Sequence, residues 1–347
     1  MDLILLDSDF NICGIVEKYS ELRWNRRYFA AGDFELRLSP EYFENLRAAR
    51  YIYHSENDET AIIENVRYDL DEDGRHILYA GGRMLEALFF DRVIDKTVML
   101  EGNIETAVND LVMKIAMTGD RKIDRLLISS TDGFDYTVSE QVTGRNLMEF
   151  LYTLLRSYGL SFSLHYDYLY DDISFQIYGG KNRSRSQSVN SVAVFSTDFE
   201  NIKSDRYIFS ISDYKNFAYV AGEGTGADRV VTTVDMIPEG EDRRELFVDA
   251  RDVRKTLSDG TALTDAEYLL GLKSRGTEKL KSHCIVDYAE CNIDSESNLV
   301  YRKDYDIGDI CDFDDPELGI SSTLRITELH EIRSGGGMTV EAVFAKA

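Results

Sequence analysis

Proline is scarce in this chain, whose 347 residues include only Pro40, Pro238 and Pro316. A proline-rich linker between domains is therefore excluded. Long apolar runs are also missing, because no stretch approaches the ~18 residues that span a bilayer. The N-terminal segment Met1–Asp7 has no basic region and only a short apolar run, so it does not have the pattern of a signal peptide. We therefore expect a soluble protein without a membrane anchor.

Cysteine is scarce as well, with four in the chain: Cys13, Cys284, Cys291 and Cys311. A secreted domain held together by disulfides is shorter and denser in cysteine. A structural zinc site would need paired Cys-x-x-Cys spacing, which these positions do not have. We interpret Cys284, Cys291 and Cys311, which lie in or beside apolar stretches, as small buried hydrophobic residues.

Positive charge is in short supply. The chain has 39 Lys and Arg against 63 Asp and Glu, which gives a formal net charge of −24. Nucleic acids and anionic lipids are bound by clustered Lys and Arg, so the charge argues against both as specific partners. Disorder is excluded too, because 43% of the residues are hydrophobic and 11% are aromatic.

Alternation of apolar and charged residues predicts that the N-terminal third consists of strands. Residues 22–29 form a strand-like run toward Gly32, and residues 34–38 alternate with a period of two, which is typical of a strand with one buried face. A short helix is expected to begin at Pro40. Residues 1–97 are therefore predicted to form a first β-barrel.

An acidic turn, Asp69–Gly74, separates two further strand-like runs at 61–68 and 75–80. Its final Asp-Gly pair favours a hairpin, because both residues tolerate positive φ. The turn begins like a calcium loop, but an EF-hand needs Glu at loop position twelve, where this chain has Ala80. We therefore predict the tip of a hairpin and no metal site.

The composition changes after the first barrel. Apolar residues recur at helical spacing over 104–115 and over 147–158, which predicts two amphipathic helices. Strand-like runs follow the second helix, so residues 98–205 are predicted to form an inserted α+β domain. Residues 179–190, rich in Gly, Ser, Lys and Arg, are expected to be its least ordered part.

Strands return in the last third and are interrupted by one helix. Thr264 followed by Glu267 is a capping box, which predicts a helix over 264–281. Residues 206–347 are predicted to form a second barrel, with the alternative that 206–225 complete the first one. The expected fold class is β-rich α+β, with two β-barrel domains and an inserted α+β domain.

Two glycine-rich segments do not match phosphate-binding motifs. Gly222–Ala227 leads into the β-branched run Val230–Val234 rather than into a helix, so we interpret it as a loop between strands. Gly179–Arg185 lacks Walker spacing. We interpret it as a solvated loop ordered by an acidic neighbour, with phosphate contact as the alternative. Since neither H-E-x-x-H nor G-x-S-x-G occurs, we predict no catalytic, cofactor or metal site and no enzyme activity.

Patches of the sequence, in this order, resemble siphovirus-type phage and prophage tail-hub proteins. They are Trp24–Tyr28 with Gly32–Leu36, Asn216–Gly224 with Asp228–Arg229, Arg244–Asp252, and Tyr305–Ile310 with Arg325–Glu328. The candidate interface or family-motif residues within these patches are Trp24, Arg26, Tyr28, Gly32, Phe34, Gly222, Gly224, Arg229, Gly308 and Asp309.

The resemblance implies a structural, baseplate-hub-like protein with two tail-tube-like barrels per chain and three chains in a ring. The implied partners are further copies of the chain, tail-tube and distal tail proteins, the tape-measure C-terminus, and receptor-binding or fibre proteins. DNA would pass through without specific binding. The implied location is the virion tail tip, after assembly in the bacterial host cytoplasm. Because the sequence stops at Ala347, soon after the second barrel, we expect none of the lysin activity found in extended relatives.

Two alternative functions stay open at this point. One is the hub of a phage-derived contractile injection device, and the other is a tail protein that binds or hydrolyses cell-wall glycan. Trp24, the single tryptophan, is predicted in the barrel core, with an interface anchor as the alternative. The acidic residues that we suspect of lining the bore, rather than facing bulk water, are Asp69, Asp71, Asp73, Asp312, Asp314 and Asp315.

Overall fold

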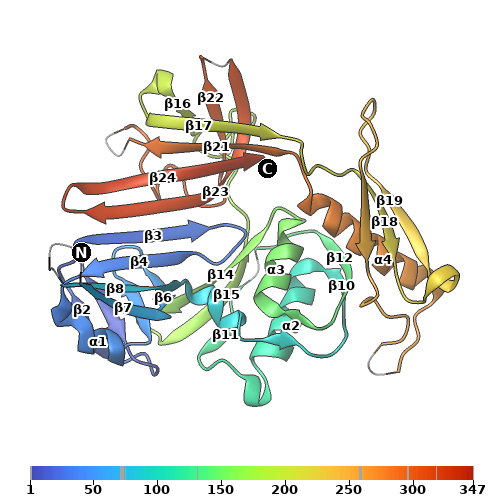
Figure 1. Ribbon diagram of the computed structural model, residues 1–347, viewed down its shortest axis with the longest axis horizontal. Helices are drawn as coiled ribbons and strands as arrows, with labels where there is room; N and C mark the ends of the chain where they lie inside the picture. The colour runs from blue at the N-terminus through green and yellow to red at the C-terminus, as the bar shows by residue number, and fades with distance from the viewer. Residues whose placement is uncertain are drawn as a thin grey trace. The chain divides into compact units, whose positions relative to one another are not determined.

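The computed structural model describes residues 2–70, 74, 76–130, 132–257, 260–294, 297–317 and 319–346 (Figure 1). The chain divides into two compact units. Unit 1 consists of Met1–Ala87, Ser163–Ile208 and Asp287–Ala347, and unit 2 of Leu88–Phe162 and Phe209–Val286. Each unit is thus assembled from segments distant in sequence, whereas the domains expected from the sequence are consecutive.

The largest sheet, of ten strands, belongs to unit 1. Its main path is β17 (Ile202–Ser210), β21 (Val286–Ile293), β24 (Gly337–Lys346), β23 (Ile320–Ser334), β3 (Glu21–Arg27), β4 (Asp33–Leu38), β8 (His76–Arg83) and β7 (Asn65–Leu70). Off this path, β22 (Ile310–Asp315) pairs with β23 and with the short β16 (Val194–Ser196). In Figure 1 the red β23 lies beside the blue β3, so this sheet joins the two ends of the chain.

A four-stranded sheet also belongs to unit 1, in the order β2 (Ile12–Val16), β1 (Leu3–Leu6), β5 (Tyr51–His54) and β6 (Glu59–Ile62). The predicted helix near Pro40 is confirmed as the turn η1 (Pro40–Tyr42) and α1 (Phe43–Ala48). The other elements are β14 (Ser161–Asp167), β15 (Asp172–Tyr178), η4 (Thr197–Phe199) and, at the division between the units, η2 (Leu85–Phe89).

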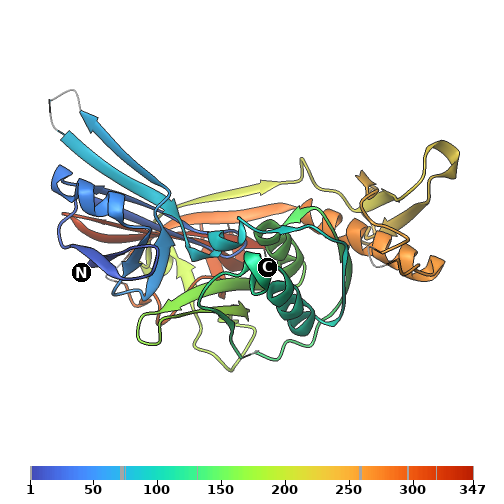
Figure 2. The ribbon, with the colours of Figure 1, turned by 90° about the horizontal axis from the view of Figure 1, so that it is seen from below.

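The predicted hairpin is confirmed as well. Strands β7 and β8 pair antiparallel from Asn65 opposite Gly81 to Leu70 opposite His76, and Figure 2 shows this hairpin along its length. Asp71 and Asp73, two of the suspected bore residues, lie outside the described residues.

Two apolar clusters form the core of unit 1. One contains the inward-facing residues of β3 and β4, including Trp24 and Phe34. The other contains Cys291 and Cys311, which confirms their interpretation as buried residues. For Cys284 that interpretation is wrong, because the residue is exposed in the connection that leads from a helix to β21.

Unit 2 contains both predicted amphipathic helices. They are α2 (Ile104–Ala116) and α3 (Leu147–Arg156), and each begins at an asparagine, Asn103 or Asn146, whose side chain accepts hydrogen bonds from backbone N–H groups of the first turn. The strands of this part are β9 (Val93–Ile94), β10 (Val98–Asn103), β11 (Leu126–Ile128), β12 (Thr137–Val142) and β13 (Arg145–Asn146), with the turn η3 (Gly119–Arg121).

The rest of unit 2 is a three-stranded sheet with a helix against one face. The order is β19 (Val231–Asp235), β18 (Phe217–Ala221) and β20 (Glu245–Asp249), with η5 (Gly226–Asp228) before β19. The helix is α4 (Asp265–Ser282), and its predicted capping box between Thr264 and Glu267 is confirmed. Ala218, Val220 and Val248 pack with Tyr268 and other residues of α4.

The two predicted barrels are not confirmed. Among the described residues, no sheet closes on itself: the largest one ends at β17, at β7 and, on its branch, at β16, and each of the others is an open path. The β-rich α+β class is confirmed. Alternation along a strand predicts that one of its faces is buried, but it does not predict whether the first and last strands of a sheet meet.

Candidate functional site

Within the described residues, no group of three or more His, Cys, Asp or Glu side chains is placed to hold a metal ion. In the same part of the chain, no helix has the length and apolar character to cross a membrane. The residues singled out from the sequence instead lie in polar networks within the two units.

The first network surrounds the carboxylate of Glu59 on β6. The indole N–H of Trp24 donates to Glu59 Oε2 at 2.7 Å. Arg26 Nε lies 2.8 Å from Glu59 Oε1, and Arg302 Nη2 lies 2.9 Å from Oε2. Arg26 also pairs with Asp306. Burial alone would lower the pKa of Arg26, but Glu59 and Asp306 raise it well above its ordinary value.

This network explains why Trp24 and Arg26 stand out in the sequence. Trp24 is fully buried, which confirms its assignment to the core. Its ring packs against Phe34, with the ring centroids 5.7 Å apart. Glu59 and Arg302 were not identified from the sequence, since they lie far from Trp24 in the chain and no local motif marks them.

Gly32 and Gly308 are positions where the backbone passes close to other atoms. A Cβ on Gly32 would lie 2.2 Å from the carbonyl oxygen of Asn25, next to the β3–β4 turn. Gly308 has φ +85°, and a Cβ there would lie 2.3 Å from Cε2 of the buried Tyr28 ring. Both glycines are therefore required by the structure of unit 1.

A second network in unit 1 is centred on Asp309. Its carboxylate accepts hydrogen bonds from the backbone N–H of Lys181 at 2.8 Å and from Arg183 Nε at 2.6 Å. Arg185, two residues on, pairs with Asp314 and donates its backbone N–H to Asp312 at 2.8 Å. The interpretation of this loop as one ordered by acidic neighbours is confirmed. The expectation that 179–190 is the least ordered segment is wrong for this anchored half.

The suspected bore residues that lie among the described residues also have local partners. Asp312 is buried, and it also accepts a hydrogen bond from the Thr323 hydroxyl at 2.8 Å. Asp314 pairs with Arg185. Asp69 lies 2.7 Å from Arg67 on the same strand. Asp315 Oδ1 accepts the backbone N–H of Glu317 at 2.9 Å. These four carboxylates thus have partners within unit 1.

Gly222, Gly224 and Arg229 come together in unit 2. Arg229 donates to the carbonyl oxygens of Gly222 at 2.9 Å and Ala221 at 2.7 Å. A Cβ on Gly222 would lie 2.3 Å from the Tyr268 hydroxyl, and Gly224 has φ +105°. These contacts confirm that the glycine-rich segment is a tight turn between strands.

Unit 2 also contains a buried ion network that no sequence pattern indicated. Arg275 of α4 lies 3.3 Å from Glu140, 2.8 Å from Asp252 and 3.4 Å from Glu278. Burial raises the pKa of Glu140 to about 7. In unit 1, burial likewise raises the pKa of Glu86 to about 7. Each unit therefore contains a buried carboxyl group that titrates near neutral pH.

A cavity of about 380 Å³ in unit 1 is lined by residues that include Cys291, Arg206, Glu290 and His330. Burial raises the pKa of Cys291, so its thiol is protonated and a poor nucleophile. Arg206 lies 3.8 Å from Glu290. These groups do not form an activated nucleophile.

The chain is similar to known phage proteins over its whole length. The model of the family described as Siphovirus ReqiPepy6 Gp37-like protein matches residues 2–345. No curated protein matches the chain.

Three solved structures share the fold. The tail protein from Neisseria meningitidis MC58 is 13% identical, with TM-score 0.59, over 99% of this chain and 96% of that one. The 43 kDa tail protein of prophage MuSo2 from Shewanella oneidensis is 14% identical, with TM-score 0.59, over 100% and 98%. The prophage tail protein gp18 from Listeria monocytogenes EGD-e is 13% identical, with TM-score 0.58, over 100% and 95%.

Proposed function

The chain belongs to the Siphovirus ReqiPepy6 Gp37-like protein family, and from this premise we propose that it is the structural hub of a phage or prophage tail tip. The family match confirms the resemblance to siphovirus-type tail proteins found in the sequence. The hub joins the tail tube and distal tail ring to the tip, and DNA passes through it.

The observation that supports this proposal best is the extent of the shared fold. Three proteins described as tail proteins are covered over 95% or more of their own length, together with 99% or more of this chain. The shared region is therefore the whole architecture rather than one common module. In addition, the family-motif residues stabilise the fold in buried networks, as expected of a structural rather than a catalytic protein.

The open sheets of the chain support a ring of copies. In the described residues, the largest sheet ends in the edge strands β17 and β7, with β16 as a further edge on its branch. Unpaired edge strands are sites for pairing with another chain, and closed cyclic symmetry satisfies every such edge. We propose three copies per ring, in which the barrels that one chain does not close are completed between neighbouring copies.

The charge of the chain suits a DNA conduit. A surface with a net charge of −24 per chain repels phosphate, so DNA would slide past rather than bind. We propose that the protein has no enzyme activity and that its partners are tail-tube, distal tail, tape-measure and fibre proteins.

The location of the protein in assembled particles tests this function. A peptide tag on the chain, labelled with gold-conjugated antibody, is expected at the tail tip of each particle. Deletion of the coding sequence is expected to leave filled heads that lack finished tails. Label along the tube or on the head, or finished tails without the protein, would refute the proposal.

A further inference from the structure

The outer face of the sheet β19–β18–β20 in unit 2 is largely exposed, although its positions Phe217 and Ala221 are buried. Helix α4 packs on the other face, where Ala218, Val220 and Val248 are buried. Because side chains alternate along a strand and the strand register is known, the outer face is a grid of three by three positions. Its rows are Asp235, Phe217 and Glu245, then Thr233, Tyr219 and Phe247, then Val231, Ala221 and Asp249.

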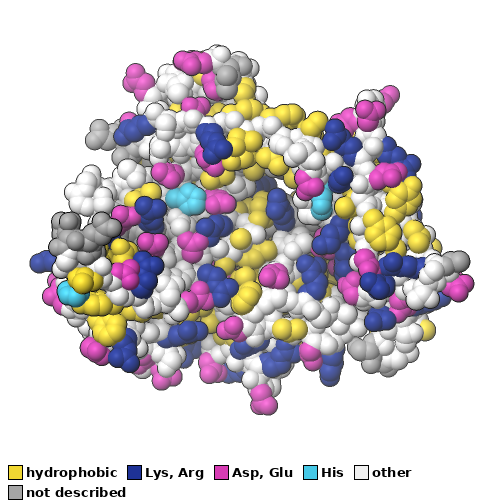
Figure 3. All heavy atoms as spheres, viewed as in Figure 1, with side chains coloured by type: hydrophobic (Ala, Val, Ile, Leu, Met, Phe, Trp, Pro, Cys, Tyr) yellow, Lys and Arg dark blue, Asp and Glu magenta, His cyan; other side chains and the backbone are white. Residues whose placement is uncertain are grey.

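Each of the three strands contributes one large exposed apolar side chain to this grid, and those of β18 and β20, Tyr219 and Phe247, are neighbours in one row. Phe247 is 62% exposed, Val231 53% and Tyr219 36%. Figure 3 shows hydrophobic side chains gathered over β18 and β19, with charged side chains around them. Strands β18 and β20 are parallel. Exposed apolar side chains that are contiguous and rimmed by polar residues are typical of a surface that contacts another protein.

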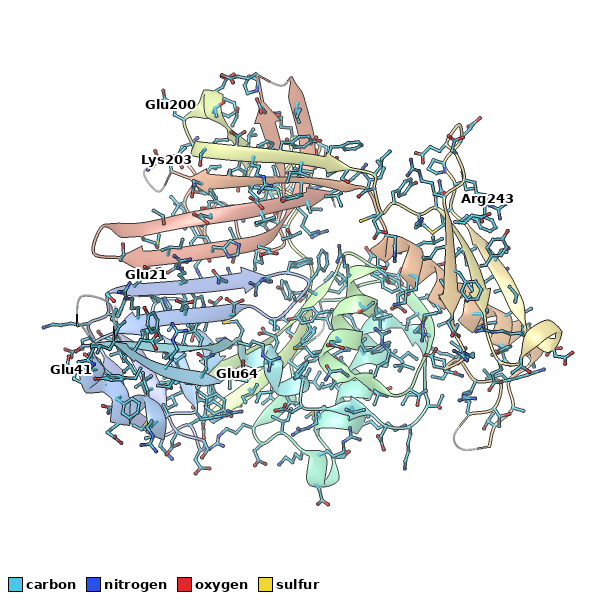
Figure 4. All side chains as sticks on the ribbon, in the orientation of Figure 1. Glu21, Glu41, Glu64, Glu200, Lys203 and Arg243 are labelled. Atoms are coloured by element: carbon cyan, nitrogen blue, oxygen red, sulfur yellow. The ribbon has the colours of Figure 1, made fainter. Side chains whose placement is uncertain are left out.

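Arginines cover part of this surface. The Arg243 guanidinium lies 3.5 Å from the Phe217 ring centroid, and its Nη2 donates to the Tyr219 hydroxyl at 2.8 Å. Figure 4 labels Arg243 beside these strands. Arg229 lies 5.8 Å from the Phe247 ring centroid. A cation held over an aromatic ring stiffens the surface, which lowers the entropy lost on binding.

The charges of this face select the kind of partner. Asp235, Glu245 and Asp249 occupy three of the nine positions, and Glu245 and Asp249 pair with Arg243 and Arg229. Three carboxylates in the grid would repel the phosphates of a nucleic acid. A surface with both signs around an apolar centre has the composition of a protein–protein interface. In a closed ring of three copies, such a face meets a different surface of the neighbouring copy.

The distribution of charge between the units favours the same partner. Unit 1 has 20 Lys and Arg against 38 Asp and Glu, a formal charge of −18, whereas unit 2 has 19 against 25, or −6. Copies of an acidic chain repel each other least where the surface is least acidic. We propose that the outer face of β19–β18–β20 is a contact surface between two copies of this chain. This inference rests on the proposed ring and names one of its contacts.

The test is the mass of the isolated full-length chain by multi-angle light scattering. Phe247→Glu places a charge among the exposed apolar side chains of this face. Because Phe247 is 62% exposed, the change does not disturb the core. The matched control is Leu169→Glu, which adds the same charge at a residue of unit 1 that is 86% exposed. We expect wild type and control to form the same oligomer. For Phe247→Glu we expect an association affinity at least roughly tenfold lower, as for an interface residue that contributes to binding.

Val231→Asp is a second variant, on a different strand, and is expected to weaken association in the same direction. Circular dichroism spectra that match wild type show that both variants are folded. An oligomer that Phe247→Glu and Val231→Asp leave unchanged would overturn the inference, while the labelling result at the tail tip would still support the hub. A monomeric wild type, or binding of a single-stranded oligonucleotide that Phe247→Glu abolishes, would also overturn it.

Discussion

The two units of this chain differ in net charge and in the surroundings of their charged side chains. Unit 1 carries three times the formal negative charge of unit 2, and its Glu59 and Asp309 are held by arginines from distant segments of the chain. Unit 2, with a formal charge of −6, is the less acidic of the two and has large apolar side chains exposed on one face of a sheet. We infer a division of roles, in which unit 1 contributes sheet edges and most of the negative charge and unit 2 contributes an apolar contact face.

Both units are stabilised by buried ion networks, but the networks connect different kinds of elements. In unit 1 the network ties β3 and β6 to the segment around Arg302, more than 200 positions away in the chain. In unit 2 Arg275 of α4 binds Glu140 of β12. Breaking a buried pair leaves an unpaired charge, which costs more than the pair itself contributes. Each unit therefore depends on a few charged residues that local sequence does not mark.

The largest effect on stability is expected at Trp24, in unit 1. Trp24→Ala removes a fully buried ring and the donor to Glu59, and we expect a loss of roughly 3–5 kcal/mol in the free energy of unfolding. Denaturant titration measures it, and Leu169→Ala at an exposed position should change the value by less than about 0.5 kcal/mol. A loss below about 1 kcal/mol for Trp24→Ala would show that this core does not hold unit 1.

The next largest effect is a difference in stability between alanine substitutions at two glycines of unit 1 that both have positive φ angles. Gly308→Ala places a Cβ against the Tyr28 ring, whereas Gly319→Ala, at φ +66°, meets nothing within 4 Å. Both variants suffer the positive-φ penalty, but only Gly308→Ala adds a clash, so we expect it to be less stable by a further ~1–3 kcal/mol. Equal unfolding free energies for the two variants would contradict the close contact between Gly308 and Tyr28.

The pH dependence of stability compares the two units directly. Burial raises the pKa of Glu86 in unit 1 and of Glu140 in unit 2 from 4.5 to about 7. A raised pKa means that the folded state holds the proton more tightly, so the stabilising contribution is complete below pH 4.5 and is lost as the pH rises through 7. The contribution of these two groups to the free energy of unfolding of the wild-type protein is therefore expected to be larger at pH 5.5 than at pH 7.5.

Glu86→Gln and Glu140→Gln should each reduce this difference, while Glu101→Gln, at an exposed position, should leave it unchanged. The contribution of Glu331 to stability changes with pH in the opposite direction, and at lower pH. Burial alone would raise its pKa, but His54 at 3.6 Å, the hydrogen bond from Asn57 and the nearby Arg333 lower it to about 2. Its contribution is lost as the pH falls from 4.5 toward 2, outside the window of the measurement. If neither variant flattens the profile between pH 5.5 and 7.5, these carboxyls are not held neutral.

The smallest effect concerns the loop that Asp309 anchors. Limited proteolysis of the wild type should spare the segment near Arg183, because that guanidinium is buried and bound to Asp309. Arg183→Leu should release the loop and produce early cleavage within it. Arg206→Leu, at an exposed position, is the control and should keep the wild-type pattern. Early cleavage of the wild type within 181–185 would contradict the anchoring.

Local patterns in the sequence predict local structure well. The capping box at Thr264, the helical stripe over 104–115 and the hairpin ending at Gly74 depend on residues near each other in the chain, and the structure confirms them. The sequence places Trp24 in the core because a large apolar ring in a strand favours the buried face. The structure confirms this, since Trp24 is fully buried.

Features that depend on distant residues were not predictable in the same way. The partners of Trp24 and Arg26 at Glu59 and Arg302 are set by the pairing of β3 with β23 and by the path of the chain between them. The loop 179–190 has a composition typical of mobile segments, and only the position of Asp309 shows that it is anchored. Barrel closure, finally, depends on whether edge strands meet, which a pattern within one strand does not encode.

The central claim is that three copies of this chain form the hub of a tail tip. Electron cryomicroscopy of purified tails, averaged without imposed symmetry at the tip, tests it most directly. The account predicts a threefold ring whose density fits three copies of the chain, with the outer face of β19–β18–β20 covered. A sixfold ring of this chain, or a tip whose density excludes it, would contradict the account.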